Sequence, residues 1–547
     1  METYNKKELA HVNFKILHIN RLERIFIMSL NIIGIGGTGH RILKAVIHLA
    51  AIGAFGKSTP ALELNVLTVD SDGGNADFKN LQDAIDAYKN YQGVLGGFPK
   101  IETPKDKINW SPFSEQEAQP SLATYIKAGK FSDENKFGEI IDFLYTKDEQ
   151  EMVLANGFYG HPSIGSYIVN GELDDADDES AWKRFVNNLD EVEDCVFIIG
   201  SIYGGTGASG IPVITQKMRK LKPEIKMATL LSLPYFMPVG NTKNANDRIS
   251  PETSYFIPKT MGALYYYDQQ GYAKNIGTSV NSLYIVGERD SSYWEKEQYS
   301  VGGGSQEHKA HISELFAALS CVDFYRRFKN LRNNANVDII ENESVYIPRR
   351  IMDDSERYPY TWEMLEMQDK QLKEQLMIFM MTAILFTKLY YHELGVEGKA
   401  SNVKIQKFQV TNEEKKKLYG YMLNFCNWMK ELHTQNMKEG DTITNKPEEN
   451  ILVEFFKIYD KGNMYDLIDG SRDERKPYEL NNFETLIKNK SEKKGFGGGI
   501  KVESKKIPSS RKILDEIPRQ MPEKDLSVFI EHINNICKTT LQREGLI

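Results

Sequence analysis

Two glycine-rich turns are the parts of this sequence whose residue types and spacing suggest chemistry. The first reads GIGGTGH, and its Gly34, Gly36 and Gly39 follow a short apolar run and precede an apolar helical pattern. Bare backbone N–H groups at such a turn, together with a helix N-terminus, favour the binding of a phosphate. The same turn is typical of dinucleotide-binding enzymes, and it also occurs as a purely structural turn. Alone, it leaves all three interpretations open.

A second turn of the same kind, YGGTGASG, lies between another apolar run and another helical pattern. Two such turns on one sheet suggest a polyphosphate held from both sides, with the hydroxyls of Thr206 and Ser209 donating to phosphate oxygens or lying near a magnesium ion. Neither turn carries the lysine of GxxxxGK[ST], so backbone amides, helix dipoles and a metal ion must neutralise the phosphates. The residues of the two turns that we expect to contact the nucleotide are Gly34, Gly36, Gly37, Thr38, Gly39, Gly204, Gly205, Thr206, Gly207 and Ser209.

The elements that must position these turns are read from apolar runs. Continuous rather than alternating apolar residues, each run followed by a helical pattern, predict a parallel sheet covered on both faces. The polar stretch 76–155 predicts helices and surface excursions between the core strands. The fold class expected is α/β: a parallel Rossmann-like sheet with helices on both faces, a central helix, and a second, α+β C-terminal domain. The strand patterns are LNIIGI, LNVLTVD, CVFIIG, KMATLLSLPYF and VNSLYIVGERD.

The length of 547 residues indicates two or three packed units. We expect a leader over 1–28, a nucleotide-binding domain over 29–305, and a central helix with the loop after it over 306–347. The C-terminal α+β domain would occupy 348–547 and include a mobile basic loop at about 470–512.

Composition and charge exclude several classes of protein. Apolar residues make up 41% and charged residues 26%, which argues against disorder, collagen-like repeats and a membrane-embedded body. The net charge of −8 argues against a dedicated nucleic-acid binder. The apolar run Leu376 to Phe386 has eleven residues, too few to span a bilayer, so it predicts a buried helix and no transmembrane segment is expected.

Metal and disulfide sites are not predicted. The four cysteines lie more than one hundred residues apart without a CxxC motif, which fits a reducing, cytoplasmic setting. His308 and His311 share one helical face in this interpretation, and their place at the start of a helix explains them without a metal.

The order of these motifs resembles the tubulin and FtsZ superfamily of GTP-binding, filament-forming proteins over roughly residues 29–345. YGGTGASGIP is similar to the family's signature loop, with Tyr203 where a small residue is usual and Ser209 where a glycine is usual. The resemblance implies that this loop and GIGGTGH contact the phosphates, and that Asp70 and Asp72, which follow the second strand, assist magnesium or phosphate binding. In a dinucleotide-binding enzyme those two acids would instead hold a ribose.

Further residues enter only through the resemblance. GHPSIG is similar to the segment that contacts the terminal phosphate, which implies that role for Gly160, His161 and Gly165. A helix starting near Gln306 resembles the central helix whose start touches the base. The family's asparagine is absent there, which leaves the choice of base open.

NVDIIE after that helix resembles the acid loop that acts on the nucleotide of the neighbouring subunit, which makes Asp338 and Glu341 the candidate catalytic acids. A carboxylate there would orient or deprotonate a water beside a magnesium-bound phosphate. The same residues read equally well as a strand between units.

Three functions follow. The resemblance implies a cytoplasmic protein that binds GTP or GDP with Mg²⁺, self-associates head to tail into filaments and hydrolyses GTP at the subunit interface. A second interpretation is a nucleotide-sensing interaction module without filaments, belonging to a bacterial multi-gene, defence-type system and binding protein partners through its C-terminal domain. A third, an NAD(P)-dependent oxidoreductase, predicts dinucleotide binding without phosphate release.

Overall fold

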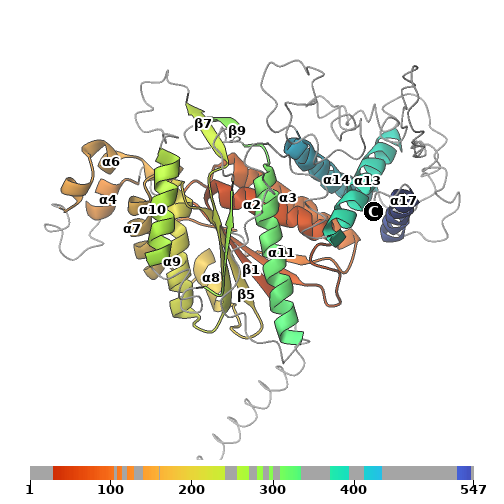
Figure 1. The fold of residues 1–547 in the computed structure, drawn as a ribbon, viewed down its shortest axis with the longest axis horizontal. Helices are drawn as coiled ribbons and strands as arrows, with labels where there is room; N and C mark the ends of the chain where they lie inside the picture. Colours follow the sequence, from red (N-terminus) through yellow and green to blue (C-terminus); the bar gives the residue numbers. More distant parts are fainter. Residues whose placement is uncertain are drawn as a thin grey trace, which may run out of the picture.

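The core of the chain is a seven-stranded parallel sheet with helices on both faces (Figure 1). The computed structural model describes residues 29–103, 108–113, 120–127, 140–158, 160–240, 255–269, 280–287, 295–299, 308–333, 370–393, 412–433, 526–543 and 547. Six strands follow the order β3-β2-β1-β5-β6-β8, and β4 also pairs with β2. The parallel α/β class expected from the apolar runs is confirmed.

The strands are β1 (Ser29–Ile35), β2 (Glu63–Val69), β3 (Lys100–Glu102), β4 (Asn109–Trp110), β5 (Cys195–Ser201), β6 (Lys226–Ser232), β7 (Phe236–Gly240), β8 (Ser282–Val286) and β9 (Glu295–Tyr299). β7 and β9 form a separate two-stranded sheet. The helices are α2 (Gly36–Ala51), α3 (Ala76–Val94), α4 (Leu122–Lys127), α6 (Lys147–Glu151), η1 (Leu154–Asn156), α7 (Pro162–Asp174), α8 (Ala181–Asn187), α9 (Gly205–Leu221), α10 (Phe256–Gln269), α11 (Ile312–Asn333), α13 (Lys370–Glu393), α14 (Asn412–His433) and α17 (Leu526–Arg543).

Successive side chains of the central strands enter opposite cores, which explains their continuous apolar sequences. On β1, Ile32 packs with α2, α3 and α11, whereas Ile33 packs with α7, α8 and α9. Both side chains are fully buried. A strand covered on both faces needs apolar residues at every position, so the pattern LNIIGI is the expected one.

Helix α14 of the C-terminal half packs directly on α2 and α3 (Figure 1). His48 on α2 stacks on Trp428 of α14 with ring centroids 4.6 Å apart, and Tyr91 on α3 stacks on Tyr421 at 4.7 Å. These four side chains are at most 1% exposed and belong to one continuous core. The predicted apolar helix Leu376 to Phe386 lies inside α13 and is buried, apart from a half-buried Ile378.

The central helix begins later than expected. A start near Gln306 was predicted, but α11 begins at Ile312. His311 explains the start: its Nδ1 accepts from the Ser313 N–H at 3.1 Å, and the Glu314 carboxylate accepts from the His311 N–H at 3.0 Å. This is the reciprocal arrangement of a helix cap.

Several expectations lie outside the described residues. They include Gln306, the acids Asp338 and Glu341, and the basic loop at 470–512. The leader 1–28 is also outside them, and the boundary at 348 stays a prediction. Within the described part of the chain, no helix is both long and apolar enough to cross a bilayer.

Candidate functional site

A cleft opens where the strand order of the sheet reverses direction. From β1 the chain moves outward to β2 and β3, and then returns to the other side of β1 with β5, β6 and β8. Ligands of open α/β sheets bind at this reversal, beyond the carboxyl ends of the strands. Here the residues after β1, β2 and β5 line one cleft, whose empty space is about 910 Å³ counted out to its open mouth.

The first glycine turn places the N-terminus of α2 in this cleft. Gly36 has a φ of +71°, which side chains rarely adopt, and a Cβ there would stand 3.3 Å from Thr206 of the second turn. The residue preceding α2, Ile35, has no side chain that could cap the helix. The first amides of α2 therefore lack a side-chain acceptor, which suits an anion.

The second glycine turn places the N-terminus of α9 in the same cleft. The residue preceding this helix is Gly204, so it too lacks a side-chain cap. A Cβ on Gly205 would stand 2.8 Å from the backbone N of Gly160, so glycine is required for the turn to lie this close to its neighbour. Two helix N-termini without side-chain caps thus lie close together at the cleft, each with its partial positive charge.

Asp70 and Asp72 lie on the same cleft, at the end of β2. The two acids form a tight turn, in which Asp70 Oδ1 accepts from the Asp72 N–H at 3.2 Å and Asp72 Oδ1 accepts from the Gly74 N–H at 3.0 Å. Burial raises the pKa of Asp70 to about 7, and the Asp72 charge adds to the rise. His40 lies beneath, with its Nδ1 4.0 Å from Asp70 Oδ2, and burial lowers the pKa of His40 to about 4.

We expect Asp70 to make the ligand-free protein less stable as the pH rises from about 4 to about 7. In this window the unfolded chain has lost the Asp70 proton, because its pKa there is 3.8, while the folded chain keeps it, because its pKa is about 7. Folding then takes up a proton, so the free energy of unfolding falls with rising pH. Asp70→Asn should be more stable than wild type at pH 8, by up to about 4 kcal/mol.

Thermal unfolding of both proteins between pH 4 and pH 8, with EDTA present, measures this effect. The gap between the Asn variant and the wild type should widen as the pH rises. A gap that stays constant over the range would show that Asp70 does not titrate there.

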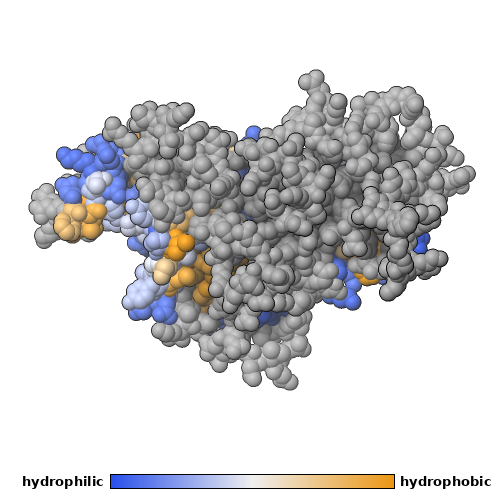
Figure 2. All heavy atoms as spheres, turned by 45° about the horizontal axis from the view of Figure 1, so that its top comes forward, coloured by the Kyte–Doolittle hydropathy of each residue, from blue (hydrophilic) through white to orange (hydrophobic). Residues whose placement is uncertain are grey.

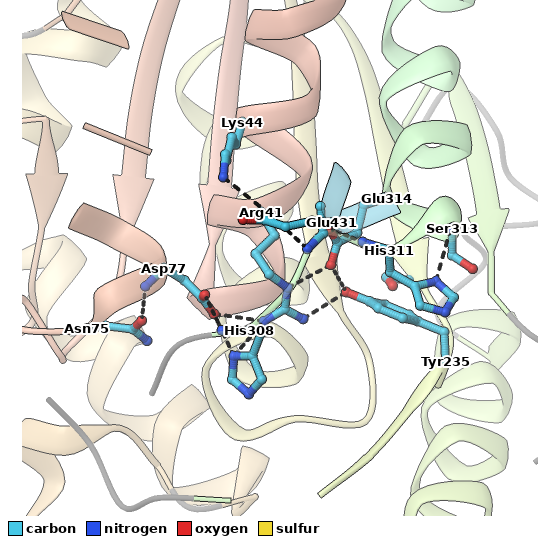
Figure 3. A network of polar contacts seen from close by, with 12 residues as sticks. Arg41, Lys44, Asn75, Asp77, Tyr235, His308, His311, Ser313, Glu314 and Glu431 are labelled. Atoms are coloured by element: carbon cyan, nitrogen blue, oxygen red, sulfur yellow. Dashed lines mark hydrogen bonds and ion pairs between the residues drawn. The ribbon is translucent and has the colours of Figure 1, made fainter. Parts of the chain in front are cut away.

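A buried polar network, some of whose residues line the cleft, joins α2 to its neighbours (Figure 3). At its centre is Arg41 of α2, whose Nε donates to Glu314 at 2.6 Å and whose NH1 donates to Asp77 at 2.7 Å. Its NH2 donates to the Tyr235 hydroxyl at 2.8 Å, and that hydroxyl donates to Glu314 at 2.7 Å. Arg41 is 6% exposed and the two acids are 2% or less. The network therefore ties α2 to α3 and α11 at the cleft.

His308 extends this network into the cleft. Its Nδ1 is 2.8 Å from the Asp77 carboxylate, and its backbone N–H donates to the same group at 3.2 Å. Burial alone would raise the pKa of Asp77, but the charges of His308 and Arg41 outweigh it and hold that pKa well below its usual range. The His308 ring packs beside Phe236, with centroids 5.6 Å apart, and both line the cleft.

The structure brings together most of the predicted nucleotide contacts. Those that line the cleft are Gly36, Gly37, Thr38, Asp70, Asp72, Gly160, Gly204, Gly205, Thr206 and Gly207. Two that do not line it, Gly34 and Gly39, are explained by packing. A Cβ on Gly39 would stand 2.8 Å from the backbone of Gly34, so these two glycines let α2 approach β1.

Three further predicted contacts serve other purposes in the structure. The Ser209 hydroxyl donates to the carbonyls of Gly205 and Thr206 at 2.8 and 2.9 Å, so it points back along α9. Gly165 lies against Ser209, where α7 crosses α9. His161 forms an ion pair with Glu149 at 3.4 Å.

Sequence reasoning did not find several cleft residues. Asp77 and Asn75 had one usable signal, since they follow the acid turn TVDSDGG at the start of a helix. The aromatic residues come from segments far apart in the chain and carried no signal. The cleft residues without a predicted role in nucleotide binding are Arg41, Asn75, Asp77, Gly157, Phe158, Ser201, Tyr203, Phe236, Phe256 and His308.

No metal-binding cluster accompanies the cleft in the described residues: nowhere among them do three His, Cys, Asp or Glu side chains converge as ligands. The cations of the cleft wall, Arg41 and His308, both face Asp77. Among these lining residues, the positive charge available to an anion is therefore chiefly that of the helix N-termini.

Comparisons with known proteins find no match in sequence and a low similarity in structure. No protein-family model matches the sequence, and no curated protein matches it. Among solved structures, CetZ from Methanosaeta thermophila strain DSM 6194, a tubulin/FtsZ family protein, is similar at 12% identity and a TM-score of 0.25. The match covers 57% of this chain and 56% of that one, so the chain spans about half the length of this relative.

Proposed function

We propose that this chain binds GTP with Mg²⁺ in the cleft, assembles head to tail and hydrolyses the nucleotide between subunits. The observation that carries the proposal is the pair of uncapped helix N-termini, α2 and α9, that lie close together in a cleft also lined by Asp70 and Asp72. A polyphosphate with a bound divalent cation is the ligand that fits both the amides and the acids.

The residues fit such a ligand as follows. The amides of Gly36, Gly37 and Thr38 and those of Gly205 to Gly207 would hold the phosphates. Asp70 and Asp72 would hold the Mg²⁺ ion, which usually takes one or two carboxylates and completes its shell with phosphate oxygens and water. The metal would supply neutralisation of the phosphate charge. The rings of Phe236 and His308 would contact the base at the other end of the cleft.

Hydrolysis is assigned to Asp338 and Glu341 by the motif resemblance, and both lie outside the described residues. A head-to-tail contact is heterologous, so it generates filaments and lets one subunit complete the site of the next. Asp338→Ala should still bind GTP with near wild-type affinity and lose phosphate release by about a hundredfold. Wild-type phosphate release and polymerisation by this variant would remove Asp338 from the proposal.

The function is tested by pelleting and phosphate release with GTP, with ATP or with neither, in magnesium, over a range of protein concentrations. The proposal expects GTP to drive both, with turnover per subunit rising steeply above a critical concentration. Turnover per subunit that does not depend on protein concentration would contradict an active site shared between subunits. Equal responses to ATP would contradict guanine specificity.

A nucleotide-sensing module without filaments is the second candidate, and Tyr203 favours it. In place of the usual small residue, this tyrosine is 3% exposed and packs on Phe256 with ring centroids 5.0 Å apart, which fills the wall of the cleft. This candidate expects tight nucleotide binding without pelleting or turnover.

A further inference from the structure

Helix α10 turns two different faces to its surroundings. Phe256, Thr260 and Tyr267 are buried on its inner face, and Phe256 lines the cleft. Ile257 and Met261 are 50% and 66% exposed, and apolar side chains reach the surface in this part of the molecule (Figure 2). The inner face of α10 therefore forms one support of the cleft.

Lys259 connects this helix to the cleft wall. Its ammonium donates to the carbonyl oxygen of Gly160 at 2.9 Å, and its side chain is half-buried. Within the described residues no carboxylate forms an ion pair with it. Burial lowers the pKa of Lys259, and no neighbouring acid offsets that effect. A cation placed like this without an acid normally serves an anion or a carbonyl group.

Gly160, whose carbonyl accepts from Lys259, lines one corner of the cleft. Its φ of +77° is one that side chains rarely adopt, and its backbone N lies against Gly205 at the start of α9. The next residue, His161, precedes α7 and gives that helix no side-chain cap. Lys259 is close enough to lower the pKa of His161, although burial is the larger cause.

The cleft consequently has an acidic side and a positive corner. Asp70 and Asp72 lie on the acidic side, whereas the corner combines the Lys259 ammonium and the α7 N-terminus around Gly160. His161 beside it pairs with Glu149, and burial lowers its pKa, so the positive charge of the corner comes from Lys259 and the helix. With α2 and α9 holding the inner phosphates, a third phosphate would lie at this corner.

We propose that Lys259 is a positioning residue that fixes Gly160 against the terminal phosphate, so that the cleft distinguishes nucleoside triphosphates from diphosphates. This inference rests on the proposed nucleotide function. Lys259 acts through the Gly160 carbonyl: with the ammonium in place, the Gly160 backbone stays against α9 and its amide faces the phosphate. A diphosphate does not reach the corner and gains nothing from it.

The test is a binding titration in magnesium with β,γ-imido-GTP and with GDP. Lys259→Met should weaken the triphosphate analogue by about tenfold, the loss expected for one hydrogen bond to a charged group. The dissociation constant for GDP should change by less than about twofold, and Lys259→Arg should recover most of the loss. Lys217→Met is the matched control, because the half-buried Lys217 pairs with Asp174 on α7 away from the cleft and should change neither affinity.

The outcomes separate this inference from the function on which it rests. If wild type binds neither nucleotide, the proposed function itself fails. If wild type binds both and Lys259→Met weakens neither, or weakens both equally, the function stands and the role of Lys259 is wrong. Thermal unfolding of each variant shows whether a uniform loss comes from a damaged fold.

Discussion

Replacing Arg41 by methionine should lower the free energy of unfolding by about 3 to 5 kcal/mol, the usual cost of removing one partner from a buried ion pair. Two carboxylates, those of Asp77 and Glu314, would then be buried without the cation that they share. The loss should be larger at pH 8 than at pH 4, because the Arg41 charge is one of the causes that lower the pKa of Asp77, so without it Asp77 takes up a proton more readily as the pH falls.

Urea unfolding at both pH values measures this loss. Arg184→Met supplies the matched control, since Arg184 pairs with Glu179 at 2.5 Å but the two side chains are 32% and 81% exposed. An exposed pair of this kind is worth less than about 1 kcal/mol. If the two variants lost similar free energies of unfolding, burial would not make the Arg41 ion pairs more stabilising than an exposed pair.

The second large effect is expected at Gly37, which lines the cleft. Gly37→Val should weaken GTP binding by about a hundredfold while the melting temperature changes little. Gly37 is half-buried at the start of α2, and a Cβ there would stand 3.4 Å from Asp77 and 3.5 Å from Asn75, which is ordinary contact. The space at Gly37 therefore admits a Cβ, and the larger valine would bring methyl groups next to the α2 amides, where a phosphate would lie.

Two further variants define the cause of this loss. Gly37→Ala adds a single carbon in permitted space and should lose much less affinity. Gly73→Val places the larger side chain on a nearby turn with no atom within 4 Å of its Cβ, and it should bind normally. Unchanged binding by Gly37→Val would show that nucleotide phosphates do not lie on α2.

Local sequence patterns were sufficient for the sheet but not for all its strands. β1, β2, β5, β6 and β8 each bury several consecutive side chains, and that burial requires the apolar runs from which they were predicted. β3 and β4 have three and two residues, within a stretch predicted to form helices and surface excursions. Strands so short carry no periodicity and depend on pairing with β2.

The glycine turns show the same limit for the site. A glycine motif shows where the backbone must come close to a neighbouring group, but it does not show whether that group is a ligand or another part of the protein. Gly36 and Gly205 line the cleft, whereas Gly34 and Gly39 of the same motif bring α2 close to β1. Arg41 was missed because its partners Asp77 and Glu314 are 36 and 273 residues away, and no spacing within one sequence reveals such contacts.

The stacking of His48 on Trp428 and of Tyr91 on Tyr421 bears on how this protein can change over evolution. Helix α14 packs on α2 and α3, the helices that also carry residues of the cleft. A recombination event that replaced the C-terminal half would have to supply aromatic side chains equivalent to Trp428 and Tyr421, or leave His48 and Tyr91 exposed to water. The two halves are thus bound to evolve together, residue against residue, rather than to be exchanged as modules.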